Sequence, residues 1–156
     1  MIKKFITVLI FTFILSCGYS PVFQNDKNFN FKLDKISYIG DKKLNRNLEK
    51  NLELYKKNES VNIFDLDITS FKNVDILTKD EKGNATSFKT KININIVLTN
   101  KSNDKTITKN FSREKTYNSM DNKFELSQYR LNLEKNILSI ILQEIKVFLS
   151  LIENDL

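Results

Sequence analysis

Residues 87–99 read SFKTKININIVLT and alternate apolar with polar side chains along most of their length. Successive side chains of a β-strand point to opposite faces, so this pattern predicts a strand that is buried on one face and solvated on the other. The expected buried face carries Phe88, Ile92, Ile94, Ile96 and Leu98, and the expected solvated face carries Lys89, Lys91, Asn93 and Asn95.

Polar stretches on either side of this strand predict turns. Residues 80–85 (DEKGNA) have the composition of a hairpin connection, and residues 100–105 (NKSNDK) form a second polar turn. The segment before the first turn, 61–78, is apolar but irregular (Val61, Ile63, then Phe64, Leu66, Ile68), which predicts a strand with a bulge. The segment after the second turn, 106–117, has apolar residues at odd positions and predicts a further strand.

The segment 29–39 (FNFKLDKISYI) predicts another strand, ahead of the first helix. Its alternation runs to Leu33 and then shifts phase to Ile36 and Tyr38, so we expect a bulge near Asp34 and Lys35.

Two segments have a helical period. In 41–58, Leu44, Leu48, Leu52 and Tyr55 share one face, and Asp41 is placed to cap the helix. A longer helix is expected over roughly 124–152, with Asn122 and Glu125 at capping-box spacing. From Ile137 onward its apolar residues cover more than one stripe. Contacts with both the sheet and the first helix are one explanation for this wide apolar surface, and contact with an additional protein or membrane surface is the other.

The expected order is strand, helix, three strands, helix. The sequence therefore predicts an α+β fold with a four-stranded, mostly antiparallel sheet and two α-helices packed on one face (β-α-β-β-β-α). We expect a single domain over 29–156, with a polar outer sheet face that includes Lys91, Asn93 and Asn95.

The N-terminus, MIKKFITVLIFTFILSC, has the order of a secretory signal peptide: Lys3 and Lys4, an apolar run, then a small residue. The run 5–15 would span roughly 16 Å as a helix, less than a bilayer core of about 30 Å. Residues 14–17 (ILSC) resemble a bacterial lipobox. That resemblance implies removal of 1–16, a lipid on Cys17, a tether over 17–28, and an outer-membrane anchor facing the periplasm. An ordinary signal peptide or an uncleaved anchor is the alternative.

The amino-acid composition limits the kinds of catalytic site, metal site and partner that we expect for this chain. The chain has no histidine and one cysteine, which argues against histidine-based catalysis, most zinc sites and a disulfide. Without residues 1–16 the formal charge falls from +6 to +4 (23 basic against 19 acidic residues), which suits an anionic partner. We expect no enzyme activity, no metal or cofactor beyond the lipid on Cys17, and no nucleic-acid partner. A lipid-anchored enzyme would need a catalytic cluster, and isolated carboxylates such as Asp65 and Asp67 do not make one.

The CGYSPVF sequence from Cys17, the element order, and REKTYNSMDNKFELSQYRLNLEKNILSIILQEI at 113–145 resemble the LptE/RlpB family of lipopolysaccharide-assembly lipoproteins. The resemblance implies a non-enzymatic outer-membrane lipoprotein that plugs the LptD β-barrel, helps it assemble, and assists lipopolysaccharide insertion at the cell surface. Another periplasmic lipoprotein, such as a transport subunit or a lipid carrier, is the competing interpretation.

The family resemblance also implies that basic residues near the sheet and its loops bind lipopolysaccharide. By location alone the candidates are Lys79 and Lys82 at the first turn and Lys101 and Lys105 at the second. Their ammonium groups would meet phosphates as point charges. Solvated loop charge is the alternative for each of them.

Overall fold

The structure, a computed structural model, describes residues 31–57 and 59–154. Its elements are β1 (Lys32–Gly40), α2 (Lys42–Lys56), β2 (Ile63–Lys79), β3 (Ala85–Asn100), β4 (Thr106–Asn118) and α3 (Lys123–Asn154). This order confirms the predicted β-α-β-β-β-α arrangement. The predictions for 1–16, for Cys17 and for the tether at 17–28 lie outside the described residues.

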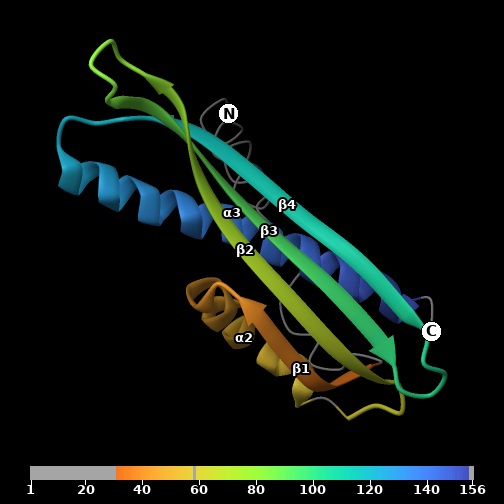
Figure 1. Ribbon diagram of the computed structural model, residues 1–156. Helices are drawn as coiled ribbons and strands as arrows, with labels where there is room; N and C mark the ends of the chain where they lie inside the picture. The colour runs from red at the N-terminus through yellow and green to blue at the C-terminus, as the bar shows by residue number, and fades with distance from the viewer. Residues whose placement is uncertain (1–30, 58, 155–156) are drawn as a thin grey trace, which may run out of the picture.

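The four strands form one sheet in the order β1-β2-β3-β4. β2 pairs antiparallel with β3, and β3 with β4, while β1 runs parallel to β2. Both helices lie behind the same face of this sheet, with α2 beside β1 and α3 along the length of β3 and β4 (Figure 1). The mostly antiparallel α+β fold is therefore confirmed, with one parallel pair that follows from the helical crossover between β1 and β2.

The core lies between the sheet and the two helices. β3 contributes Ile92, Ile94, Ile96 and Leu98, as the alternation of 87–99 predicts. Burying one such side chain stabilises the fold by about 1.5–3 kcal/mol. The buried residues of the helices are Leu44, Leu48, Leu52 and Tyr55 of α2 and Leu126, Leu133, Ile137, Leu138, Ile141, Leu142, Ile145, Leu149 and Ile152 of α3. Neither of these helices has a segment that is both long and apolar enough to cross a membrane.

The predicted bulge in β1 is confirmed, because the register with β2 shifts between Leu33 and Ile36. The bulge predicted within 61–78 is confirmed as a register shift between Ile76 and Thr78. β2 keeps one register with β3 from Phe64 to Ile76, and its irregularities lie further on, between Ile76 and Lys79. Val61, which suggested the phase change, precedes the strand and is 89% exposed.

Both predicted helix caps are present. The Asp41 carboxylate accepts hydrogen bonds from the backbone N–H groups of Lys43 (2.9 Å) and Leu44 (3.0 Å). At the start of α3 the Asn122 side-chain oxygen accepts from Phe124 N–H at 2.9 Å and Glu125 N–H at 3.3 Å. These bonds satisfy donors that a helix N-terminus otherwise leaves unpaired.

Gly40 makes the junction between β1 and α2 possible. Its φ is +103°, and a Cβ at this position would lie 1.9 Å from the carbonyl oxygen of Ser70. The next residue, Asp41, donates its N–H to that same oxygen at 3.0 Å. Close packing of this turn on β2 therefore requires glycine.

Candidate functional site

Lys79 and Lys82 lie at the tip of the β2–β3 hairpin and are exposed. The turn is held by Asp80, which accepts from the backbone N–H groups of Lys82 (2.9 Å) and Asn84 (2.8 Å) and from the Asn84 amide group (3.0 Å). These bonds, led by the one from the Asn84 side chain, keep the pKa of Asp80 below its ordinary value. Neither lysine has an ion-pair partner among the described residues.

Lys101 and Lys105 lie in the turn between β3 and β4. Lys101 Nζ is 2.7 Å from Asp34 Oδ2, next to the bulge of β1. This hydrogen bond lowers the pKa of Asp34 and raises the pKa of Lys101. Lys105 is exposed, and the described ion pairs do not include it. Of the two lysines that this turn could offer a phosphate group, one is thus already ion-paired within the protein.

The four lysines do not form one site. The two turns are at opposite ends of β3, whose 16 residues span roughly 50 Å at 3.3 Å per residue. Figure 1 shows the β2–β3 hairpin and the β3–β4 turn at opposite ends of the sheet. A single lipid phosphate group can meet one pair or the other.

The outer sheet face is polar along most of its length, as predicted. Lys91, Asn93 and Asn95 lie on it, paired in register with Asn73, Phe71 and Thr69 of β2. On β4 the same face carries Thr106, Thr108, Asn110, Ser112, Glu114 and Thr116. Phe71 is its main exposed aromatic residue among those described. Neither α2 nor α3 covers this face (Figure 1), so within the described part of the chain it is available to a hydrophilic partner surface.

A groove of about 560 Å³ lies between β4 and α3. From α3 it is lined by Ile140, Val147 and Leu151, which are 47%, 43% and 57% exposed. β4 contributes Phe111, whose ring packs edge-on against Phe148 of α3 with centroids 5.8 Å apart. The wide apolar surface predicted for α3 is therefore only partly used within the fold.

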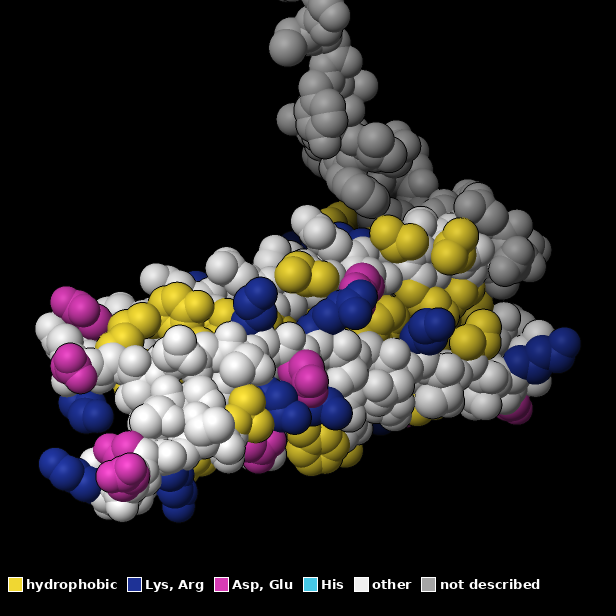
Figure 2. All heavy atoms as spheres, turned by 90° about the horizontal axis from the view of Figure 1, so that it is seen from above, with side chains coloured by type: hydrophobic (Ala, Val, Ile, Leu, Met, Phe, Trp, Pro, Cys, Tyr) yellow, Lys and Arg dark blue, Asp and Glu magenta, His cyan; other side chains and the backbone are white. Residues whose placement is uncertain are grey.

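Basic side chains border this groove. Arg113 of β4 is ion-paired with Glu144 of α3 across the groove, with Nε 2.9 Å from Oε1. Lys109 also lines it and is exposed. Figure 2 shows the resulting pattern, a row of hydrophobic side chains with basic ones between them.

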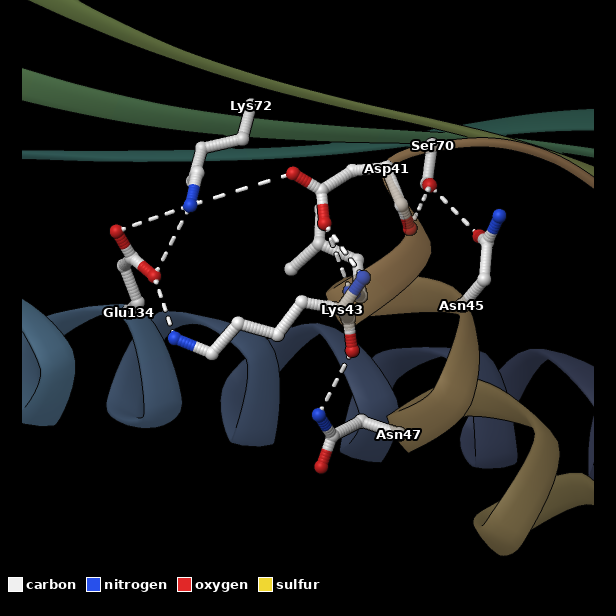
Figure 3. A network of polar contacts seen from close by, with 8 residues as sticks. Asp41, Lys43, Asn45, Asn47, Ser70, Lys72 and Glu134 are labelled. Atoms are coloured by element: carbon white, nitrogen blue, oxygen red, sulfur yellow. Dashed lines mark hydrogen bonds and ion pairs between the residues drawn. The ribbon is translucent and has the colours of Figure 1, made fainter.

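A second polar cluster joins both helices to the sheet (Figure 3). Glu134 of α3 accepts hydrogen bonds from Lys72 of β2 and Lys43 of α2, each at 3.2 Å. Lys72 is also 4.0 Å from Asp41, the cap of α2. Nearby, the buried Ser70 hydroxyl donates to Asn45 Oδ1 at 2.7 Å. The described contacts pair each of these charges within the fold, so the cluster positions α2 relative to α3.

The hairpin half of the sheet is supported by aromatic packing around Arg130. Its guanidinium lies 5.0 Å from the ring centre of Phe88, and its Nε donates to the Tyr117 hydroxyl at 2.8 Å. Tyr117 stacks on Phe88 with centroids 5.5 Å apart.

The described residues contain no group of three or more acidic or cysteine side chains able to hold a metal ion.

Sequence reasoning did not identify Lys72, Glu134, Arg113 or Lys109. The ion pairs of the first three join elements far apart in the chain, and no local period marks them. The exposed apolar stripe of α3 did have a signal, because Ile140, Val147 and Leu151 recur at helical spacing on a face that the sheet does not cover.

The fold and these surfaces define a small α+β domain in which two helices back a mixed four-stranded sheet. Solved bacterial lipoproteins share this fold. The structure is similar to rare lipoprotein B from Shewanella oneidensis, with a TM-score of 0.57 and 13% identity over 78% of this chain and 98% of that one. A minor lipoprotein from Acinetobacter baumannii gives a TM-score of 0.56 and 11% identity over 78% of this chain and 91% of that one.

A third similar structure is lipoprotein B from Nitrosomonas europaea, with a TM-score of 0.50 and 14% identity over 79% of this chain and 86% of that one. The resemblance to the LptE/RlpB family is thus confirmed at the level of the fold. No protein-family model matches the sequence, and no curated protein matches it either.

Proposed function

We propose that this chain is a lipid-anchored lipoprotein on the periplasmic side of the outer membrane, which plugs the LptD β-barrel, helps it assemble and assists lipopolysaccharide insertion. The observation that carries the proposal is the conjunction of a lipobox-like sequence at 14–17 with the fold of rare lipoprotein B over most of the chain. The proposal includes lipidation of Cys17 and no catalytic activity.

The uncovered sheet face supports a plug. The lumen of an outer-membrane barrel is polar, and a protein that fills it needs a broad hydrophilic surface. The asparagine, threonine and lysine side chains of β3 and β4 provide one. A lipid carrier needs an enclosed apolar cavity instead, whereas the space between β4 and α3 is an open groove.

An affinity pull-down tests this proposal. The full-length chain with a C-terminal tag is purified from outer membranes in mild detergent, and the Cys17→Ala variant serves as the anchor control. We expect one large β-barrel protein in equal amounts with the wild type, and loss of outer-membrane recovery for the variant. Recovery of inner-membrane transport components, or of no partner, contradicts the plug and favours another lipid-handling lipoprotein.

The lysines are tested in pairs because the structure separates them. Lys79→Glu with Lys82→Glu alters the hairpin tip, and Lys101→Glu with Lys105→Glu alters the other turn. If lipopolysaccharide binds by phosphate contacts at one end, one double variant weakens binding and the other does not. Equal binding by both double variants and the wild type would show that all four lysines are solvated loop charges.

A further inference from the structure

β4 is an open edge of the sheet, since β3 is its only partner strand in the part of the chain that the structure describes. Its 13 residues contain no proline or glycine. They pair with β3 from Thr106 to Asn118 without a register shift. A regular strand of this length offers a straight row of backbone groups roughly 43 Å long.

The ladder shows which backbone groups point outward. Asn100 N–H donates to Lys105 O, and Ser119 N–H donates to Thr86 O, at the two ends of the β3–β4 pairing. Hydrogen bonding alternates along an antiparallel strand, so the odd-numbered residues of β4 bond to β3. The even-numbered ones, among them Thr108, Asn110 and Ser112, direct their N–H and C=O groups away from the sheet.

The opposite edge is less suited to pairing with another chain. β1 is nine residues long and carries a bulge between Leu33 and Ile36. Beyond Ser70, where β1 ends its pairing, β2 has register shifts between Ile76 and Lys79. Bulges and short strands are features that protect an edge from pairing. β4 has neither a bulge nor a short length, so its edge is better suited than the β1 edge to pair with an added strand.

The groove lies directly beside this edge. On the helix-facing side of β4 the residues in sequence are Lys109, Phe111, Arg113 and Lys115. A strand added to β4 would place alternate side chains next to these, with its central ones over the apolar wall formed by Ile140, Val147 and Leu151 of α3. Backbone bonds would give such a strand affinity, and the groove would select its side chains.

We propose that β4 accepts an extended segment of a partner protein as a fifth strand, with apolar side chains over the groove and acidic ones opposite Lys109 and Lys115. The charges favour such a partner over a second copy of this chain. Two β4 strands paired antiparallel about Phe111 would set Lys109 of each opposite Arg113 of the other, and like charges in directly opposed positions are destabilising. The inference concerns this edge alone and does not depend on the identity of the barrel proposed above.

The test uses the full mature lipoprotein in detergent and a fluorescent peptide, Glu-Thr-Val-Thr-Val-Thr-Glu. Its glutamates match Lys109 and Lys115, and its valines lie over the groove. We expect saturable binding by fluorescence anisotropy, with slowed amide exchange at Asn110 and Ser112. Ser112→Pro removes an outward N–H and should weaken binding at least about tenfold, whereas Ser112→Ala keeps that N–H and should stay within about twofold.

A second variant keeps the test valid if the proline disturbs folding. Lys109→Glu with Lys115→Glu changes only exposed charges, and should transfer preference to a peptide with lysines in place of the glutamates. Absence of binding, equal binding by Ser112→Pro in a folded state, or protection confined to other strands overturns the proposal. Self-association that Ser112→Pro abolishes in sedimentation would also overturn it, since the occupant would then be a second copy.

Discussion

The two halves of the sheet are stabilised differently. Next to the β3–β4 turn, four strands and α2 enclose apolar side chains such as Leu33, Leu52 and Leu66. Next to the β2–β3 hairpin the sheet has three strands, and β1 and α2 do not extend over it (Figure 1). There the buried groups include Thr90, and Arg130 packs on Phe88 and Tyr117. The first half therefore depends mainly on apolar burial, whereas the second combines a smaller set of buried apolar side chains, such as Ile92 and Leu126, with polar and aromatic contacts.

The largest effect is expected from the apolar half. Leu48 of α2 is 0% exposed, so Leu48→Ala leaves a cavity in the core and should lower the free energy of unfolding by about 3–5 kcal/mol. Urea denaturation of the purified chain measures this. Leu54→Ala in the same helix is the control, because that side chain is already exposed and its loss should change stability by less than about 0.5 kcal/mol. Similar losses for both variants would mean that α2 is not packed as described.

The two described glycines with positive φ compare the halves directly. Gly40→Ala places a Cβ against the Ser70 carbonyl in the packed half and should cost about 2–4 kcal/mol. Gly83→Ala, at the hairpin tip, meets no atom within 4 Å and pays only for its φ of +85°. Its cost should be about 1 kcal/mol. Thermal denaturation of both variants checks the order, and a reversed order would contradict the close approach of β1 to β2.

Glu134 lies where the two halves meet. Its side chain is 13% exposed and that of Lys72 is 23% exposed, so Glu134→Gln leaves the largely buried Lys72 ammonium group with only the Asp41 carboxylate, 4.0 Å away. We expect a loss of about 1–2 kcal/mol in chemical denaturation. Glu144→Gln is the matched control, because its pair with Arg113 is more exposed and should contribute less than about 1 kcal/mol. An equal loss from both would show that burial does not distinguish the two pairs.

The smallest effect concerns pH at the hairpin. The pKa of Asp80 is lower in the folded state than its ordinary value of 3.8, so its bonds stabilise the turn fully above that value. The contribution is lost as the pH falls through the folded-state pKa. The protection of the Gly83 amide, which is how much more slowly it exchanges than in the unfolded chain at the same pH, should therefore fall in acid before the protection of β1 does. If Asp80→Asn shows the same acid-dependent loss of protection, a different group is responsible.

Local periodicity explains why most elements could be predicted. The alternation of 87–99, the stripe of α2 and the cap at Asp41 each depend on residues a few positions apart, and each is confirmed. The bulge predicted within 61–78 is present but lies between Ile76 and Thr78, because Val61 continues the apolar pattern without belonging to the strand and so marks no bulge near Ile63. An apolar side chain in a connection carries the same local signal as one in a strand.

The candidate surfaces were harder to predict because they depend on pairing between distant segments. Lys72 meets Glu134 across 62 positions of the chain, and Arg113 meets Glu144 across 31. Nothing local to either residue specifies such a partner. That Lys79 and Lys101 lie at opposite ends of the sheet follows from the hairpin topology alone. The ion pair of Lys101 with Asp34 depends instead on the bulge of β1.

The crossover between β1 and β2 has a consequence for the order of folding. β2, β3 and β4 are joined by short turns, and hairpins of this kind close in about 1–10 μs. β1 reaches β2 only after the chain has passed through α2, and this larger loop costs more entropy to close. We therefore expect the three-strand meander to form first and β1 to dock onto it later. Until β1 docks, the β2 edge and the β4 edge of the meander are both unpaired. β1 then pairs with the β2 edge only.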